Sequence, residues 1–153
     1  IEFMKEIFFL RHAKSSWDDF ALKDFDRPLS TRGIQDAELM GNFFRSKKIK
    51  LDLVLSSPSK RTKETIEHFF SKDKPKLEFI DNIYHASMEN ILDELYQISE
   101  EMNTVMIVGH NPSMHDITEF FATQFDTSAS DVPLVHYRLP LKTKRFPTVQ
   151  IGH

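Results

Sequence analysis

Residues 5–12 read KEIFFLRH and residues 104–110 read TVMIVGH, and these two stretches indicate the fold class. In each of them a run of apolar residues leads into a histidine. The run at 104–108 is nearly all apolar and β-branched, which is typical of a central strand buried on both faces of a sheet. Residues 5–10 predict a first strand that ends at Arg11 and His12.

Outward from these stretches, short apolar runs alternate with amphipathic segments, as in consecutive β-α units. Further strands are expected at 51–55 and 77–80, and a weaker alternation at 134–139 predicts an edge strand. Apolar residues at helical spacing predict helices that begin near residues 31, 58, 88 and 113. The expected fold is therefore α/β, with a mostly parallel central sheet and one antiparallel edge strand.

Length and composition are those of one globular domain. The 153 residues suffice for a buried core, and 40% are hydrophobic and 28% charged. A formal net charge of −3 does not favour nucleic acid or an anionic membrane as a partner. Cysteine is absent, which excludes disulfides and thiolate metal sites. The apolar run at 7–10 is too short for a secretory signal or a membrane span, so the cytoplasm is the expected compartment.

The single domain is expected to span residues 4–140. Residues 1–3 precede Met4 and are expected to be a remnant of recombinant expression, outside the fold. Residues 141–153 combine a basic stretch with Pro147 and show no clear periodicity. They are expected to form an irregular or partly disordered tail.

Polar residues follow the ends of three predicted strands: Arg11 with His12, the segment 57–61, and His110. The carboxyl ends of parallel strands share one edge of a sheet, where ligands bind, so Arg11, His12, Arg61 and His110 are expected in one site. Two arginines and two histidines make a cationic pocket suited to a phosphate dianion. No carboxylate lies in these short segments, and such a pocket needs none.

His12 is the expected nucleophile. Attack on phosphorus needs a neutral group with a lone pair, which imidazole provides with its ordinary pKa of about 6.5 and guanidinium never does. His12 directly follows a strand and is therefore better fixed than His110. A phosphohistidine is expected to form at His12 and to be hydrolysed by water. His110 is expected to be protonated when phosphate is bound and, with Arg11 and Arg61, to neutralise the phosphoryl charge.

Four segments resemble, in order, the motifs of the histidine phosphatase superfamily, and in particular its SixA-like phosphohistidine phosphatase branch. They are FLRHAKSSW at 9–17, DRPLS at 26–30, SSPSKRT at 56–62 and VGHNP at 108–112. The resemblance implies a three-layer α/β/α sandwich of the phosphoglycerate mutase type, without a metal or other cofactor. It also implies a nucleophilic His12 and phosphate-binding roles for Arg11, Arg61 and His110.

The chain departs from the family pattern after the third predicted strand. Many relatives carry a glutamate there that can protonate the leaving group, whereas this chain has His85 at the matching position. A protonated His85 is one candidate acid, and Asp18 is a weaker one. Alternatively the leaving group needs little help, because a phosphoramidate nitrogen is protonated more readily than an ester oxygen. That alternative favours protein phosphohistidine as the substrate.

Several functions stay open at this point. The favoured one is a phosphatase whose partner is a phosphorylated protein, and the others are a small-molecule phosphate ester phosphatase or mutase of the same superfamily. Loss of the glutamate and the small size weigh against a mutase. A non-catalytic phosphate-binding regulatory module is a further alternative. A metal site is not expected, because His110 and His115 are five residues apart, the wrong spacing for paired ligands on one helix face.

Overall fold

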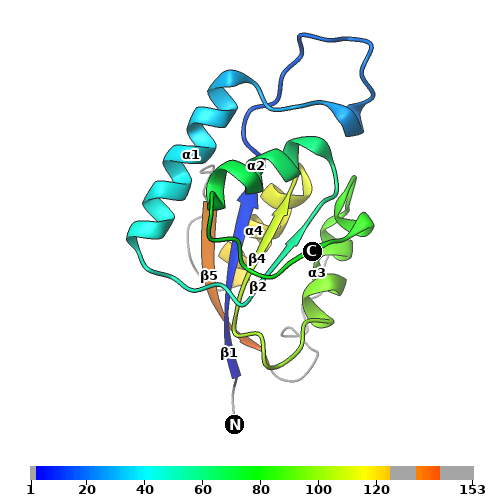
Figure 1. Ribbon diagram of the computed structural model, residues 1–153. Helices are drawn as coiled ribbons and strands as arrows, with labels where there is room; N and C mark the ends of the chain where they lie inside the picture. Colours follow the sequence, from blue (N-terminus) through cyan, green and yellow to red (C-terminus); the bar gives the residue numbers. More distant parts are fainter. Residues whose placement is uncertain (1–2, 125–133, 142–153) are drawn as a thin grey trace.

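A computed structural model describes residues 3–124 and 134–141, which form a five-stranded sheet flanked by helices (Figure 1). The strands are β1 (Phe3–Arg11), β2 (Leu53–Ser56), β3 (Leu77–Phe79), β4 (Thr104–Gly109) and β5 (Leu134–Leu141). The helices are α1 (Thr31–Ser46), α2 (Lys60–Phe70), α3 (Met88–Tyr96) and α4 (Ser113–Gln124). Two short 3-10 turns, η1 (Asp24–Asp26) and η2 (Asp81–Ile83), lie in the loops.

The strand order is β3-β2-β4-β1-β5, in which only the β1–β5 pair is antiparallel among the described strands. The expected mostly parallel sheet with one antiparallel edge strand is confirmed. β4 lies at its centre, and residues Val105, Met106, Ile107 and Val108 are each 0% exposed. This burial on both faces explains why the strand carries almost no polar residue.

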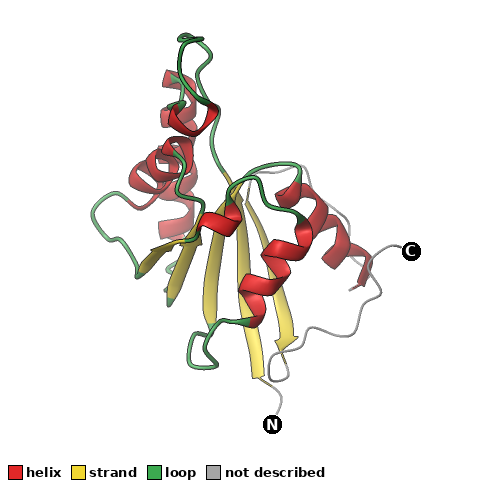
Figure 2. Cartoon of the chain, turned by 90° about the vertical axis from the view of Figure 1, so that its right-hand side faces the viewer, coloured by secondary structure: helices red, strands yellow, loops and turns green. Residues whose placement is uncertain are grey.

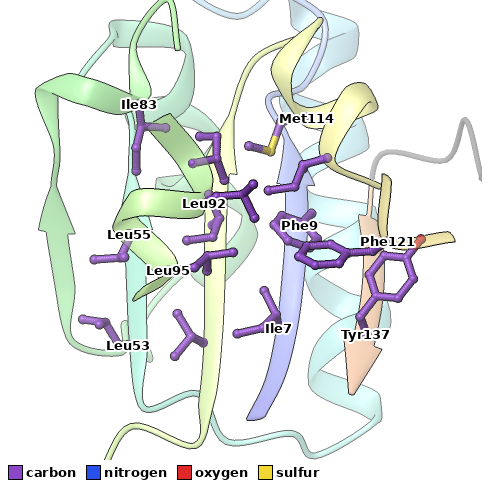
Figure 3. Packing of buried hydrophobic residues seen from close by; sticks show 14 residues of the cluster. Ile7, Phe9, Leu53, Leu55, Ile83, Leu92, Leu95, Met114, Phe121 and Tyr137 are labelled. Carbon is purple, nitrogen blue, oxygen red and sulfur yellow. The ribbon is translucent and has the colours of Figure 1, made fainter. Parts of the chain in front are cut away.

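Each face of the sheet has its own hydrophobic core, because successive side chains of a strand point to opposite faces. Ile7 and Phe9 of β1 pack with residues of α3 and α4, whereas Phe8 and Leu10 pack with residues of α1 and α2. Figure 2 shows helices on both sides of the strands. In Figure 3, Phe9, Phe121 and Tyr137 meet in the α3 and α4 core. The three-layer α/β/α sandwich is therefore confirmed.

Some element bounds differ from those expected, because pairing partners rather than local composition decide where a strand ends. β1 begins at Phe3, which pairs with Leu141 of β5. The expectation that residue 3 lies outside the fold is therefore wrong, and β5 also extends beyond residue 139. α3 ends at Tyr96, and Ile98 packs against the core from the following loop. The expected tail at 142–153 lies outside the described residues.

The loop between β1 and α1 projects beyond the carboxyl ends of the strands (Figure 1). Its two ends are joined by an isolated bridge between Ser15 and Leu29, and the Ser30 N–H donates to the Lys14 carbonyl. Ser30 also caps α1, since its hydroxyl accepts from the Gly33 N–H at 3.0 Å. The helix start expected at Ser30 or Thr31 is thus confirmed, and the cap ties α1 to the residues that follow His12.

Candidate active site

The site lies where β1, β2 and β4 end side by side. The His12 N–H donates to the Gly109 carbonyl at 3.1 Å, and the Ser57 N–H donates to the Val108 carbonyl at 3.0 Å. The loops that follow the three strands therefore start next to one another. The ring centroids of His12 and His110 are 5.1 Å apart. The two predicted histidines meet at the edge of the sheet where they were expected.

α2 is tied to the loop after β1 by one threonine. The Thr65 hydroxyl donates to the Arg61 carbonyl at 2.7 Å and accepts from the Ala13 N–H at 3.1 Å. Thr65 is 0% exposed, so these bonds are shielded from water. They hold the first turn of α2, which carries Arg61, against the backbone next to His12.

The proton on His12 is located by a single contact. Its Nδ1 lies 2.6 Å from the Ala13 carbonyl oxygen. A carbonyl oxygen only accepts hydrogen bonds, so Nδ1 must carry the proton and Nε2 keeps its lone pair. Burial lowers the pKa of His12 to about 4, and the charges of Arg61 and Arg11 act in the same direction. His12 is therefore neutral near pH 7, with Nε2 available as a nucleophile.

His110 is more deeply buried and is held by serines. Its Nε2 shares hydrogen bonds with Ser57 Oγ at 2.8 Å and with Ser59 Oγ at 3.4 Å. Burial lowers the pKa of His110 to about 3, assisted by repulsion from His12 when that ring is protonated and by the charge of Arg61. The ring is neutral near pH 7 in this structure, and its protonation with bound phosphate stays a prediction. Its buried Nδ1 has no hydrogen-bond partner among the described residues.

Arg61 contacts a carboxylate that was not expected. Its side chain is 7% exposed, and its Nη1 and Nη2 donate to the carbonyl and to Oδ2 of Asp24 at 2.6 and 3.0 Å. Partial burial raises the pKa of Asp24, but hydrogen bonds from Tyr84, Arg61 and Arg27 outweigh it and lower that pKa to about 2. Asp24 lies outside the short segments that were expected to form the pocket, and η1 brings it to Arg61 from 37 positions away. The sequence pattern therefore did not identify it.

Arg27 and Trp17 form the base of the projecting loop. Arg27 is 8% exposed and donates to Ser15 Oγ at 2.7 Å and to Asp24 Oδ1 at 3.2 Å. Its guanidinium carbon lies 3.2 Å from the centroid of a ring of Trp17. Arg27 belongs to the DRPLS motif at 26–30, but no role was expected for it. Its partners come from the loop's own conformation, which the motif does not describe.

The two acid candidates lie in different surroundings. His85 Nε2 is 3.8 Å from Asp24 Oδ2, and its ring is 4.0 Å from that of Tyr84, which in turn lies 5.6 Å from the His110 ring. The His85 side chain is 70% exposed, and its φ of 52° is unusual for a residue other than glycine. Asp18 lies on the exposed part of the loop, and no described contact connects its carboxylate with either histidine. The structure thus puts His85, but not Asp18, at the edge of the site.

Arg11 and His12 also line a cavity of about 570 Å³ on the α1 side of the loop. Trp17, Leu39 and Met40 contribute to its lining, whereas Arg61 and His110 do not.

Within residues 3–124 and 134–141, no group of three or more potential metal ligands lies together. No helix in the same part of the chain is long and apolar enough to cross a membrane.

Comparison with known proteins identifies the family of the chain. The sequence profile of the Histidine phosphatase superfamily (branch 1) matches residues 7–104. The match covers more than half of the chain, and it includes the second half of β1, His12 after it and the start of α2 with Arg61. The chain belongs to the histidine phosphatase superfamily.

Three relatives illustrate the likeness. An uncharacterized protein of Mycobacterium tuberculosis is 30% identical over 131 residues, which cover 86% of this chain and 81% of that protein. A protein of Agrobacterium tumefaciens assigned as the phosphohistidine phosphatase SixA has a similar structure, with 27% identity, a TM-score of 0.74 and coverage of 86% and 89%. A phosphoglycerate mutase of Plasmodium falciparum is 14% identical with a TM-score of 0.58 over 99% of each chain. This last likeness concerns the fold alone and confirms the phosphoglycerate mutase-like architecture.

Proposed function

We propose that the protein is a phosphatase that acts through a phosphohistidine at His12, with protein phosphohistidine as its favoured substrate. The observation that carries the proposal is the state of His12. The ring is neutral, its Nδ1 donates a hydrogen bond to the Ala13 carbonyl, and the positive charges of Arg61 and Arg11 act on it. A nucleophile fixed in this way is ready to attack phosphorus without prior loss of a proton.

The reaction would proceed in two displacements. Nε2 of His12 attacks phosphorus as the bond to the leaving group breaks. The leaving group takes that bond's electron pair and a proton, which comes from solvent or, for an ester, from protonated His85. Arg11 and Arg61 would stabilise the charge on the phosphoryl oxygens, and Nδ1 of His110 offers a ring nitrogen with unused hydrogen-bonding capacity. Water then attacks the phosphohistidine, so that inorganic phosphate leaves and His12 is restored.

The preference for phosphohistidine rests on the leaving group and on access. His85 stands where many relatives carry a glutamate, so substrates that depart without a strong protein acid are favoured. Trp17 and Leu39 beside the His12 cavity are 65% and 70% exposed, which leaves room for a side chain presented by another protein. The likeness to the Agrobacterium protein assigned as SixA points to the same class of substrate.

The test is hydrolysis of an aryl phosphate, of a set of alkyl phosphate esters and of a histidine-phosphorylated protein. The parent protein is expected to hydrolyse the phosphohistidine fastest, and His12→Ala is expected to abolish all three activities. Arg61→Ala should lower turnover by well over about tenfold, since single donors to a transition-state charge contribute at least that much. Binding of phosphate without any turnover by the parent would contradict the proposal and identify a regulatory module.

A further inference from the structure

The Asp24 carboxylate joins four side chains of the site. Besides Arg61, its oxygens accept from Tyr84 OH at 2.7 Å and from Arg27 Nη1 at 3.2 Å, and His85 Nε2 lies 3.8 Å away. With the site's function as proposed above, Arg61 must also hold the phosphoryl group. We propose that Asp24 is an internal competitor of phosphate for Arg61 and thereby sets how tightly the site retains inorganic phosphate.

The contact with Asp24 occupies both terminal nitrogens of the Arg61 guanidinium. Nη1 donates to the backbone carbonyl of Asp24 at 2.6 Å, and Nη2 donates to its carboxylate Oδ2 at 3.0 Å. Arginine uses the same pair of nitrogens to bind two oxygens of a phosphoryl group. Asp24 therefore uses the donors that would otherwise be free for substrate or product.

Charge makes the two anions exclude each other. Asp24 has a pKa lowered to about 2, so it stays ionised at any pH used for an assay. A phosphate dianion on the same guanidinium would lie within a few ångströms of this carboxylate, where like charges repel strongly in a partly buried site. Phosphate must therefore displace Asp24 from Arg61 or bind more weakly beside it.

The surroundings allow Asp24 to leave Arg61 and return. Its side chain is 41% exposed, and it belongs to η1, a turn of three residues, rather than to a packed helix. Arg27 offers its other carboxylate oxygen, Oδ1, a hydrogen bond independent of Arg61, whereas Tyr84 holds the same oxygen, Oδ2, that faces Arg61. Arg61 itself is buried and would be costly to leave without a counterion. When inorganic phosphate departs, Asp24 returns to Arg61, so the guanidinium stays paired with an anion.

Asp24→Asn tests this inference, because it removes the charge and keeps the shape. Binding of inorganic phosphate, measured by calorimetry, should tighten about tenfold, which corresponds to about 1.4 kcal/mol. The matched control is Asp26→Asn, which makes the same change in net charge in the same turn. Asp26 is exposed, and no described hydrogen bond or ion pair involves its carboxylate. The control should change phosphate affinity by less than about twofold, in line with a screened surface charge.

Tyr84→Phe provides a second variant. It removes the hydroxyl that holds Asp24 but keeps the aromatic ring, so phosphate affinity should rise in the same direction by a smaller factor. Thermal unfolding shows whether each variant folds. If Asp24→Asn does not fold, the phosphate affinity of Tyr84→Phe tests the inference in its place. Unchanged or weaker phosphate binding in the folded variant would overturn the inference and assign Asp24 to the positioning of Arg61.

Calorimetry separates this inference from the proposed function. If the parent protein shows no turnover but Asp24→Asn binds phosphate more tightly than the parent, the competition is supported and the proposed phosphatase activity is contradicted. If the parent protein turns over substrate but Asp24→Asn binds phosphate no more tightly, the phosphatase activity is supported and the competition is contradicted.

Discussion

The role proposed for His12 depends on one hydrogen bond with its neighbour in the chain. Donation from Nδ1 to the Ala13 carbonyl leaves Nε2 as the basic atom, and burial keeps the ring neutral. His110 uses the opposite nitrogen, because its Nε2 is held by Ser57. The two rings, whose centroids are 5.1 Å apart, thus use different nitrogens for hydrogen bonds within the protein.

His85 lies at the edge of the site, and its role can be tested directly. If it protonates the leaving group, His85→Ala should slow hydrolysis of alkyl phosphate esters by about a hundredfold, the usual size of a general acid's contribution. Hydrolysis of a phosphoramidate should change far less, because its nitrogen is protonated without protein help. Steady-state kinetics on the two substrate classes measure the difference.

His68→Ala is the control for that comparison, since His68 lies on α2 and pairs with Glu38 on α1. It should leave both rates as in the parent. An equal loss on esters and phosphoramidates in His85→Ala would remove the acid role.

At the scale of elements, the site is positioned by the close packing of α1 on its neighbours. A Cβ atom at Gly33 would lie 2.1 Å from the Lys14 carbonyl oxygen, and one at Gly41 would lie 2.0 Å from the Phe69 carbonyl oxygen. The two glycines therefore let α1 approach both the loop after β1 and the end of α2. Those two elements carry His12 and Arg61, so α1 supports both without contributing a reacting group.

Gly41→Ala should destabilise the protein even though alanine favours a helix over glycine by up to about 1 kcal/mol. The added methyl group meets backbone, which cannot give way as a side chain can, and overpacking of this kind costs about 1–3 kcal/mol. Urea unfolding followed by circular dichroism measures the change. Gln35→Ala at an exposed position of α1 is the matched control and should be neutral or slightly stabilising. A Gly41→Ala protein as stable as the parent would contradict the close approach.

At the scale of the whole molecule, the site makes stability depend on pH. His12 and His110 have pKa values lowered to about 4 and about 3, chiefly by burial, whereas both would return to about 6.5 in an unfolded chain. Between these values the unfolded state binds more protons than the folded state. Stability is therefore fully retained above about pH 6.5 and lost as the pH falls toward 4.

The His110 contribution to this loss should be on the order of 2 kcal/mol by about pH 5, from the linkage between protonation and unfolding. Urea unfolding at about pH 7.5 and pH 5 measures it in the parent and in His110→Asn, in which the loss should be smaller. His68→Asn removes a partly exposed histidine and should keep the parent's pH dependence. The same pH dependence in His110→Asn and the parent would show that His110 is not held neutral by the fold.

Much of the architecture could be predicted from local pattern. Alternating and continuous apolar runs identified the strands, and the rule that parallel strands end at one edge brought His12 and His110 together before any coordinates. The start of β1, which depends on pairing with β5, was predicted wrongly, and Asp24 was not identified as a partner of Arg61. Neither depends on residues near in sequence.

Sequence alone therefore determined the α/β class, the family motifs and the four side chains at the strand ends, because periodicity and position along a strand are local properties. Tertiary structure alone decided that Asp24 reaches Arg61 and Tyr84, which are 37 and 60 positions away. It also decided the protonation of both histidines, because burial and the distance to other charges exist only once the chain is folded.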